Sequence, residues 1–427
     1  MTLTPEGYIS RLAEKQLNIG LKAAGAVVLE GPRHCGKTWC ARNTAESEYP
    51  LDDPSGDSLN RRLADIDPVS VLGGAEPHLI DEWQEVPKIW DTVRYSVDCS
   101  TRHGRYILCN SSSADSSELI HSGVGRFVSV RMYTMSLFES GDSSGEVSLE
   151  GMFEGKFDII RGTARTLDEL IYLTVRGGWP DLLGAEEKKV SLFLKDMIDR
   201  ICTVDTRKAD RKQRDANKLR KTFLSLARNE STTAAKSKIA SDILGFSETK
   251  VEEETVSEYL GLFKKLFLIE DQPSFSPNYR SPVRVGKSPK RHLTDPSLAV
   301  APMGLDSGSL KHDLRTFGFL FEALCERDLR IYAQTFGGKL YHYRDHSGRE
   351  IDAVVEVPGK GWGAFEIKLG SDQIDEAARN LLAIDGFIRK DGKAEPPLFL
   401  CVICGIEAFA YRRPDGVYVV PICMLGP

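Results

Sequence analysis

The chain has 427 residues, and its formal net charge is −6. At roughly 150 residues per domain, this length predicts about three domains and excludes a single small module. The negative charge excludes a wholly basic nucleic-acid coat protein, although a local basic patch stays compatible with it.

Apolar runs and cysteines predict a cytoplasmic chain without membrane segments. The N-terminus lacks the basic and apolar regions of a signal peptide. The longest apolar run, Leu398–Ile406, has nine residues, whereas a membrane helix needs roughly 18. Nine scattered cysteines fit a reducing compartment better than a disulfide framework. We expect the CxxC of Cys401 and Cys404 to lie in a core strand, not in a zinc or redox site.

The first 140 residues predict a parallel α/β sheet. The expected elements are strands at Ala26–Glu30, Tyr49–Leu51, His78–Asp81, Arg105–Cys109 and Phe127–Val130, and a helix over Thr38–Ser47. Strands that alternate with crossover helices form parallel sheets covered on both faces.

A phosphate-binding loop is predicted directly after the first strand. The residues Gly31-Pro32-Arg33-His34-Cys35-Gly36-Lys37-Thr38 match the whole G-x-x-x-x-G-K-[ST] pattern between a strand and a helix. Glycines permit backbone torsions closed to other residues, so successive N–H groups surround phosphate oxygens at the helix N-terminus. We expect Lys37 to reach the β- and γ-phosphates of ATP and Thr38 to bind Mg²⁺.

Two carboxylates are predicted to complete this site. Asp81 and Glu82 follow the apolar pair Leu79-Ile80 at the end of a strand. We expect Asp81 to help hold Mg²⁺ through water and Glu82 to orient or polarise the attacking water. Alone, two such acidic residues are typical of a strand entering a loop, but after a phosphate loop they favour nucleotide hydrolysis.

Two further residues are candidates for contacts to the γ-phosphate. Asn110 follows the strand Arg105–Cys109 and is the candidate polar sensor, with ordinary turn chemistry as the alternative. Arg126 is the candidate arginine finger, acting in cis or in a neighbouring subunit of a homo-oligomer. The alternative for Arg126 is a solvated side chain at the start of a strand.

The segment from Leu167 to Glu270 is predicted to be helical. Within it, Ile239–Leu244, a turn at Gly245 and Val251–Leu268 resemble a helix-turn-helix. Residues 207–221 before it carry eight Lys or Arg and two Asp. This patch favours binding to DNA phosphates, with a solvated helix face as the alternative. The acidic run 252–254 would repel phosphates, so a module that binds a protein partner is the other interpretation.

The C-terminal part predicts a second α/β fold. Its expected elements are a helix from Phe317 and strands at Leu340–Tyr343, Glu350–Val357 and Gly363–Leu369. Glu322, Asp352, Glu366 and Lys368 follow the order E…D…ExK, and Glu366 and Lys368 share one face of a strand. Such carboxylates bind Mg²⁺ or Mn²⁺, and a lysine helps water attack a phosphodiester. The pattern favours a restriction-endonuclease-like fold, whether or not it cleaves.

Together these residues resemble a family of bacterial and archaeal AAA-type ATP-binding proteins whose C-terminal domain is uncharacterised and similar to restriction nucleases. The resemblance covers nearly the whole chain and is carried by Tyr8-Ile-Ser-Arg11, Gly31–Thr38, Leu51-Asp-Asp-Pro54, Asp65-Ile-Asp-Pro68, Asp81-Glu-Trp-Gln84-Glu-Val-Pro87, Gly125-Arg126, Met135-Ser-Leu-Phe138-Glu139, Gly177-Gly-Trp-Pro180 and His292-Leu-Thr-Asp295. The chain has Leu108-Cys109-Asn110-Ser111 where the family has Leu-Thr-Gly-Ser, and Trp83 where it has isoleucine.

The resemblance implies an α/β multidomain protein. We expect an AAA-type P-loop core with a parallel sheet over residues 1–140, a helical lid over 141–205, a helical, winged-helix-like region over 206–300 and a nuclease-like domain over 301–427. The leading hypothesis is an Mg²⁺-dependent ATPase whose nucleotide state controls the C-terminal domains, with DNA or a protein as partner. The alternatives are an ATP-regulated nuclease with Mg²⁺ or Mn²⁺ at its C-terminal domain and a nucleotide-sensing interaction protein with little turnover.

Overall fold

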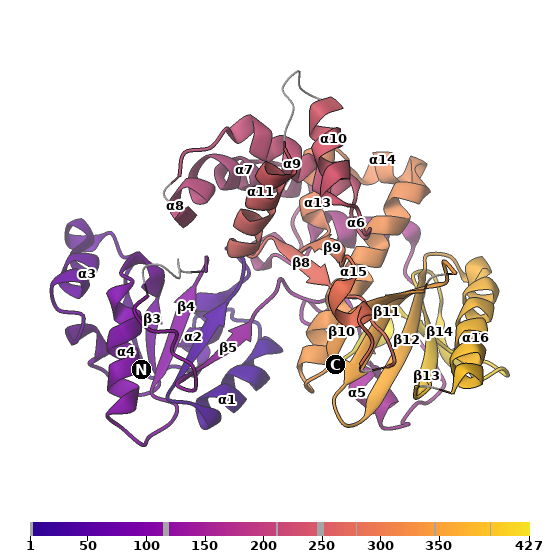
Figure 1. Cartoon of the computed structure of the whole chain (residues 1–427), viewed down its shortest axis with the longest axis horizontal. Coiled ribbons are helices and arrows are strands. Elements are labelled where there is room, and N and C mark those ends of the chain that lie inside the picture. The colour runs from indigo at the N-terminus through magenta and orange to yellow at the C-terminus, as the bar shows by residue number, and fades with distance from the viewer. Residues whose placement is uncertain are drawn as a thin grey trace.

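Two sheet-containing parts of the chain flank a set of helices (Figure 1). The computed structural model describes residues 3–113, 119–210, 212–245, 252–278, 280–345, 347–392 and 394–427. The indigo and purple N-terminal sheet lies on one side, the yellow C-terminal sheet lies on the other, and the middle helices lie above both. Among the described residues, no helix is long and apolar enough to cross a lipid bilayer.

The N-terminal sheet has five parallel strands in the order β2-β3-β4-β1-β5. Its elements are α1 Ala13–Ala23, β1 Ala26–Glu30, α2 Lys37–Thr44, β2 Ser47–Pro50, α3 Ser55–Ile66, β3 His78–Asp81, α4 Lys88–Asp98, β4 Tyr106–Asn110 and β5 Phe127–Arg131. The predicted parallel sheet is confirmed. The predicted helix over Thr38–Ser47 is too long, because α2 ends at Thr44 and Ser47 already pairs with His78 in the sheet.

Helices cover both faces of this sheet, and its central strand β1 is apolar at four successive positions, Ala26–Leu29. In β1, Val27 and Leu29 belong to the core that includes α1 and α2. Ala26 and Val28 point to the opposite face and join the core that includes α4. Successive side chains of a strand alternate between faces, so an uninterrupted apolar run requires cover on both sides.

The middle of the chain is helical, as predicted, and ends in a short antiparallel pair. Its elements are α6 Leu167–Arg176, α7 Glu187–Arg200, the π-helical turn Ile201–Asp205, α8 Thr206–Asp210, α9 Ala216–Arg228, α10 Lys236–Gly245, α11 Glu253–Lys265, β8 Ile269–Gln272, α12 Val283–Gly286, β9 Lys290–Leu293, α13 Ser297–Met303 and α14 Ser307–His312. Gly245, where we expect a turn, is the last residue of α10, and residues 246–251, which include the expected helix start at Val251, lie outside the described residues. The winged-helix assignment stays a prediction.

The C-terminal sheet has seven strands in the order β10-β11-β12-β13-β15-β14-β7. Its elements are α15 Leu314–Gln334, β10 Lys339–Arg344, β11 Glu350–Val357, β12 Gly361–Lys368, α16 Ile374–Asp391, β13 Phe399–Cys404, β14 Phe409–Arg412, β15 Tyr418–Pro421 and β16 Leu425–Gly426. Helix α16 covers one face of this sheet and α15 the other. Cys401 and Cys404 are buried in β13, as predicted. The α/β architecture is therefore confirmed, and the likeness to restriction endonucleases stays a prediction.

An early segment of the chain completes the C-terminal sheet. The elements β6 Val147–Ser148, α5 Leu149–Phe153 and β7 Ile160–Arg161 precede the helical middle. Strand β7 pairs with β14, and β6 pairs with β16. The helical lid that we predict over 141–205 therefore begins in the structure at α6.

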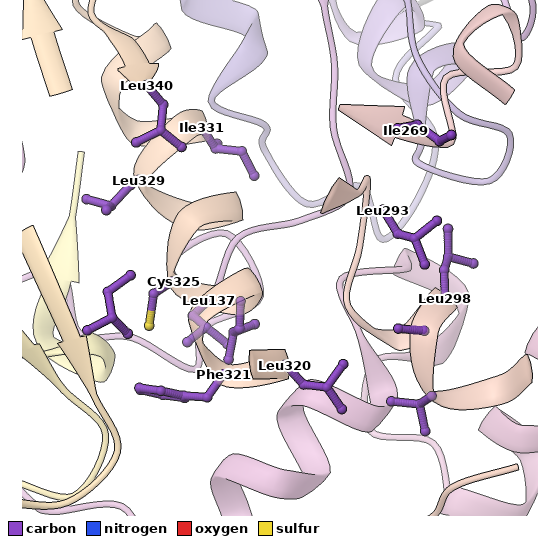
Figure 2. Packing of buried hydrophobic residues seen from close by; sticks show 14 of the residues in the cluster. Leu137, Ile269, Leu293, Leu298, Leu320, Phe321, Cys325, Leu329, Ile331 and Leu340 are labelled. Carbon is purple, nitrogen blue, oxygen red and sulfur yellow. The ribbon is translucent and has the colours of Figure 1, made fainter. Parts of the chain in front are cut away.

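A segment that follows β5, residues 132–140, connects the three parts, and we call it the strap. Leu137 on this strap belongs to the same buried cluster as Phe321 and Cys325 of α15, and Figure 2 shows these side chains together. The same cluster includes Leu293 and Leu298 of the middle region. One continuous apolar core thus joins the middle helices to the C-terminal sheet through α15.

Candidate nucleotide-binding site

The phosphate loop joins β1 to α2, and two of its glycines are required by geometry. Gly36 has φ 97° and lies at the N-cap of α2, a torsion that a side chain strongly disfavours. A Cβ atom on Gly31 would lie 2.2 Å from the carbonyl oxygen of Met132. The loop therefore turns where only glycine fits beside β5, and its backbone N–H groups are left at the start of the helix.

Lys37 and Thr38 lie where the loop meets the carboxyl end of β3. The Nζ of Lys37 donates a hydrogen bond to the carbonyl oxygen of Pro32 at 2.9 Å, so the ammonium lies inside the loop. The hydroxyl of Thr38 donates to Oδ2 of Asp81 at 2.9 Å. Residues 43 positions apart in sequence thus form one polar site, as the pattern predicted.

Asp81 has the chemistry of a magnesium ligand. Its Oδ1 is buried and has no hydrogen-bond partner among the described residues. Burial, and then the neighbouring charge of Glu82, raise the pKa of Asp81 to about 7. A buried carboxylate oxygen without a donor, beside a hydroxyl, fits a hard divalent cation, which favours oxygen ligands.

Glu82 is held at the cleft by two neighbours. Its Oε2 accepts a hydrogen bond from Ser111 Oγ at 2.9 Å and another from the Gln84 amide. The Glu82 backbone has φ 52°, in the left-handed region that non-glycine residues rarely adopt. This torsion turns the chain directly after β3, which separates the directions of Asp81 and Glu82.

Ser111, and not Asn110, faces the cleft. Asn110 is 2% exposed, its Nδ2 donates to the Ser112 carbonyl oxygen at 2.9 Å, and it does not line the cleft. Ser111 lines the cleft and contacts Glu82. The Asn110 amide thus turns its Nδ2 back onto the chain after β4, while its Oδ1 is buried without a hydrogen-bond partner among the described residues. Its role as the sensor stays a prediction. In the family's Leu-Thr-Gly-Ser pattern, the serine aligns with Ser111. That alignment points to Ser111 as the better candidate.

Arg126 lies away from this cleft. It precedes Phe127, the residue that pairs with Ala26 at the start of parallel strand β1, whereas the phosphate loop follows the other end of β1. Its Nε donates to Asp98 Oδ1 at 2.7 Å. A cis role as arginine finger is thus incompatible with this structure, and a role in a neighbouring subunit stays a prediction.

The cleft has a volume of about 860 Å³ and is closed on one side by the middle region. Arg33 of the loop forms an ion pair with Asp205 at 3.2 Å, and its Nε donates to Ser111 Oγ at 3.3 Å. His34 lies 3.9 Å from Asp181 of the middle region. Lys208 of α8 also lines the cleft. Lid residues therefore contact the same loop that the sequence predicts to bind phosphate.

Arg11 clamps the phosphate loop from behind, a role that the motif alone does not reveal. Its Nη1 donates to the Cys35 carbonyl oxygen at 2.5 Å and its Nη2 to that of Tyr133 at 3.0 Å. Its Nε donates to Glu139 at 2.9 Å. Both Arg11 and Glu139 lie in segments that carry the family resemblance. That resemblance was the only sequence feature that could have pointed to their role.

Asp295, another residue of those segments, binds parts of the chain that lie far apart in sequence. Its Oδ2 accepts from Thr134 Oγ1 at 2.7 Å, from the Gly178 backbone N–H at 2.9 Å and from Arg327 at 3.0 Å. Its Oδ1 also accepts from the Ser297 backbone N–H, although the N-cap residue of α13 is Pro296. Asp295 therefore joins the strap, the lid and α15.

The candidate nuclease residues come together only in part. Lys368 Nζ lies 2.8 Å from Glu366 Oε2 and 3.4 Å from Asp352 Oδ2. Glu322 instead binds Lys290, at 2.5 Å. In the described part of the chain, no three His, Cys, Asp or Glu side chains form a group that could hold a metal. A metal ion therefore does not fit this set as it stands.

The basic segment over residues 207–221 is partly neutralised by acidic neighbours. Arg214 pairs with Glu258 at 2.6 Å, and Arg220 pairs with Asp199. Arg211 lies outside the described residues. Lys208 is exposed and lines the candidate nucleotide cleft. These contacts weaken the case for a DNA-binding face at this segment.

A parallel sheet with a phosphate loop after β1 and acidic residues at the end of β3 defines a P-loop nucleotide-binding protein. Residues 23–140 match the family described as AAA domain. This match, together with the phosphate loop, supports ATP binding by the N-terminal part of the chain. Two families described as domains of unknown function match the rest: DUF8612 at residues 167–309 and DUF4143 at residues 317–425.

Known relatives are distant. Uncharacterized proteins of Mycobacterium bovis and Mycobacterium tuberculosis are each 24% identical to the chain over 365 residues, which cover 84% of this chain and 73% of theirs. The Walker-type ATPase of Pyrococcus abyssi has 14% identity and a TM-score of 0.45, with 71% of this chain and 98% of that chain covered.

Proposed function

We propose that the protein is an Mg²⁺-dependent ATPase whose nucleotide state controls the position of its C-terminal domains. The observation that carries this proposal is the contact between Thr38 Oγ1 and Asp81 Oδ2 beside a buried Asp81 oxygen that lacks a donor. Thr38 and Asp81 would hold Mg²⁺, which would neutralise charge on the triphosphate. Lys37 would bind the β- and γ-phosphates, together with the backbone N–H groups of residues 31–38.

Glu82 is the proposed catalytic carboxylate. It lines the same cleft as Lys37 and Thr38 and would orient water for attack on the γ-phosphate. Ser111 fixes the Glu82 side chain through one hydrogen bond. Because Ser111 also receives a hydrogen bond from Arg33, and Arg33 pairs with Asp205, the catalytic carboxylate is linked to the lid.

Two routes support control of the C-terminal part by nucleotide. The first is the lid, which contacts the loop through Asp205 and Asp181. The second is the strap after β5, where the Leu137 backbone N–H donates to Asp328 Oδ2 of α15 at 2.9 Å. A change in the loop at Cys35 would act on this strap through Arg11. The proposed domains meet at residues 140, 205 and 300, except that residues 147–161 join the C-terminal sheet.

The test is nucleotide binding and turnover in matched variants. Lys37→Ala should abolish ATP binding, because it removes the charge inside the loop. Glu82→Gln should keep ATP binding but lower turnover at least about 100-fold. Lys189→Ala, at an exposed lysine of α7, is the control and should match the wild type. Unchanged turnover in both site variants would refute the proposal.

A nuclease function is the second candidate. It is favoured by the approach of Lys368 to both Asp352 and Glu366, the geometry expected when a lysine assists phosphodiester attack beside carboxylates. Incubation with single- and double-stranded DNA and RNA in Mg²⁺ or Mn²⁺ tests it, with Asp352→Ala as the control for contaminating activity. A nucleotide-sensing role without turnover would instead show ATP binding and an ATP-dependent change of oligomeric state or partner binding.

A further inference from the structure

A lysine of the middle region enters the carboxylate cluster of the C-terminal part. Lys290, on strand β9, is 8% exposed. Its Nζ lies 2.5 Å from Glu322 Oε1 and 3.0 Å from Glu326 Oε1, both on α15. It also donates to the main-chain carbonyl oxygen of Asp352 on β11 at 3.1 Å. Three oxygen atoms from two elements of the C-terminal part therefore surround one ammonium group.

This ammonium group occupies a cation position. Hard divalent cations are bound by carboxylate and main-chain carbonyl oxygens, the same kinds of atom that Lys290 contacts. Glu326 is fully buried, and its Oε2 has no hydrogen bond within the described ranges, although His292 Nε2 lies 3.2 Å from it. The cluster thus holds a cation already, and an imidazole lies beside its remaining buried oxygen.

The charges of the cluster are not balanced by lysine alone. Lys290 faces Glu322 and Glu326, while Lys368 faces Asp352 and Glu366. Two ammonium groups against four carboxylates leave two negative charges when all groups are ionised. A divalent ion would balance these two charges.

We propose that Lys290 is a built-in counter-ion that keeps divalent metal out of this cluster. The lysine belongs to the β8–β9 pair that follows α11, and this pair is also bound to the C-terminal sheet, because Gln272 of β8 donates to the carbonyl oxygens of Tyr341 and Asp352. Loss of the lysine charge would leave Glu322, Glu326 and the Asp352 carbonyl oxygen open to Mg²⁺ or Mn²⁺. Glu322 and Asp352 keep 17% and 19% of their side chains exposed, which gives an ion a way in.

This inference explains why the predicted nuclease residues lack a metal-binding geometry. The residues are present, but Glu322 is turned to a lysine that the E…D…ExK pattern does not contain. The inference does not require ATP binding, so its test leaves the nucleotide site out.

The test measures binding of Mn²⁺ alone to the full-length chain by electron paramagnetic resonance and calorimetry, without nucleotide. All proteins carry Asp81→Asn to remove metal binding at the phosphate loop. Lys290→Met keeps the length of the side chain and removes its charge, and Lys290→Gln is the second variant because it keeps a hydrogen-bond donor. Lys287→Met, three residues earlier on the same segment, is the matched control.

We expect Lys290→Met and Lys290→Gln to bind Mn²⁺ at least about tenfold more tightly than the parent and Lys287→Met. Adding Glu322→Gln to either variant should return binding to the parent level. Folding is checked by circular dichroism, and Mn²⁺ should raise the unfolding temperature of the Lys290 variants only. Folded Lys290 variants without a gain in Mn²⁺ binding, a parent that already binds as tightly, or a gain that survives Glu322→Gln would each overturn the proposal.

Discussion

Arg11 and Glu139 form a buried ion pair with 2.9 Å between Nε and Oε1, and their side chains are 4% and 2% exposed. The buried carboxylate of Glu139 has further hydrogen bonds, since it also accepts from the backbone N–H groups of Leu12 and Ser136. Arg11 meanwhile donates to the carbonyl oxygen of Cys35 in the phosphate loop. The stability of the loop and that of the strap thus depend on one guanidinium group.

Loss of Arg11 should therefore affect both stability and nucleotide binding. Arg11→Ala leaves Glu139 buried without its charge partner, which costs about 3–5 kcal/mol of unfolding free energy, and it frees the loop. Arg389→Ala removes an exposed pair within α16 and should cost less than about 1 kcal/mol. Urea unfolding and ATP calorimetry measure the two effects. Equal behaviour of the two variants would contradict the clamp.

The contact between Arg33 and Asp205 should hold the lid against the loop without adding much stability. Asp205→Asn should change the unfolding free energy by less than about 1 kcal/mol, because Arg33 is nearly half exposed. It should nevertheless increase hydrogen exchange in residues 201–210. Asp196→Asn, which breaks the surface pair with Arg200, is the control. Unchanged hydrogen exchange in residues 201–210 of Asp205→Asn would show that the contact between Arg33 and Asp205 does not hold the lid.

Ser111 and Asn110 should differ in what their loss affects. Ser111→Ala removes a hydrogen bond that positions Glu82, so turnover should fall about tenfold while ATP affinity is kept. Asn110→Ala removes a buried amide that bonds the Ser112 carbonyl oxygen, so it should cost about 1–3 kcal/mol of stability. Steady-state kinetics beside thermal unfolding separate the two outcomes. Loss of turnover only in Asn110→Ala would restore Asn110 as the sensor.

Stability should fall with rising pH because of Glu230. Burial raises the pKa of this carboxyl from its ordinary 4.5 to about 8, while His292 Nδ1 lies 3.1 Å away and Glu326 adds like charge. The native state then holds one more proton than the unfolded state between these values. The unfolding free energy should therefore drop by about 1.4 kcal/mol per pH unit from pH 6 to 8.

Glu230→Gln provides the comparison for this effect, because its amide keeps a hydrogen-bonding group but does not titrate. The variant should show a flatter dependence of unfolding free energy on pH over the same range. Chemical unfolding at pH 6, 7 and 8 measures both proteins. Parallel pH profiles for the wild type and the variant would exclude Glu230 as the source of the slope.

The parts of the site that could be predicted from sequence are those whose residues are close together in the chain. The loop over residues 31–38 is contiguous, and its glycine torsions follow from local backbone sterics. Asp81 and Glu82 end an apolar strand, which fixes them at one edge of the sheet. These signals needed no knowledge of the tertiary fold.

The parts that could not be predicted depend on partners far apart in sequence. Lys290 and Glu322 are 32 residues apart, and nothing near either residue indicates the other. Arg11 and Glu139 are 128 residues apart. The choice between Asn110 and Ser111 has another cause, because β4 ends at Asn110, and Ser111, the first residue after the strand, lines the cleft.

The pairing of β7 with β14 limits the order in which the chain can fold during its synthesis on the ribosome. Arg161 finds its neighbour Phe409 only after about 250 further residues have been synthesised, a delay on the order of ten to fifty seconds at roughly 5–20 residues per second. During this delay the apolar side chains of Val147 and Leu149, which are buried in the folded protein, lack the C-terminal strands that bury them. The N-terminal sheet can fold early, whereas the C-terminal sheet needs strands from both ends of this long stretch of chain. We therefore expect the nascent chain to require chaperones.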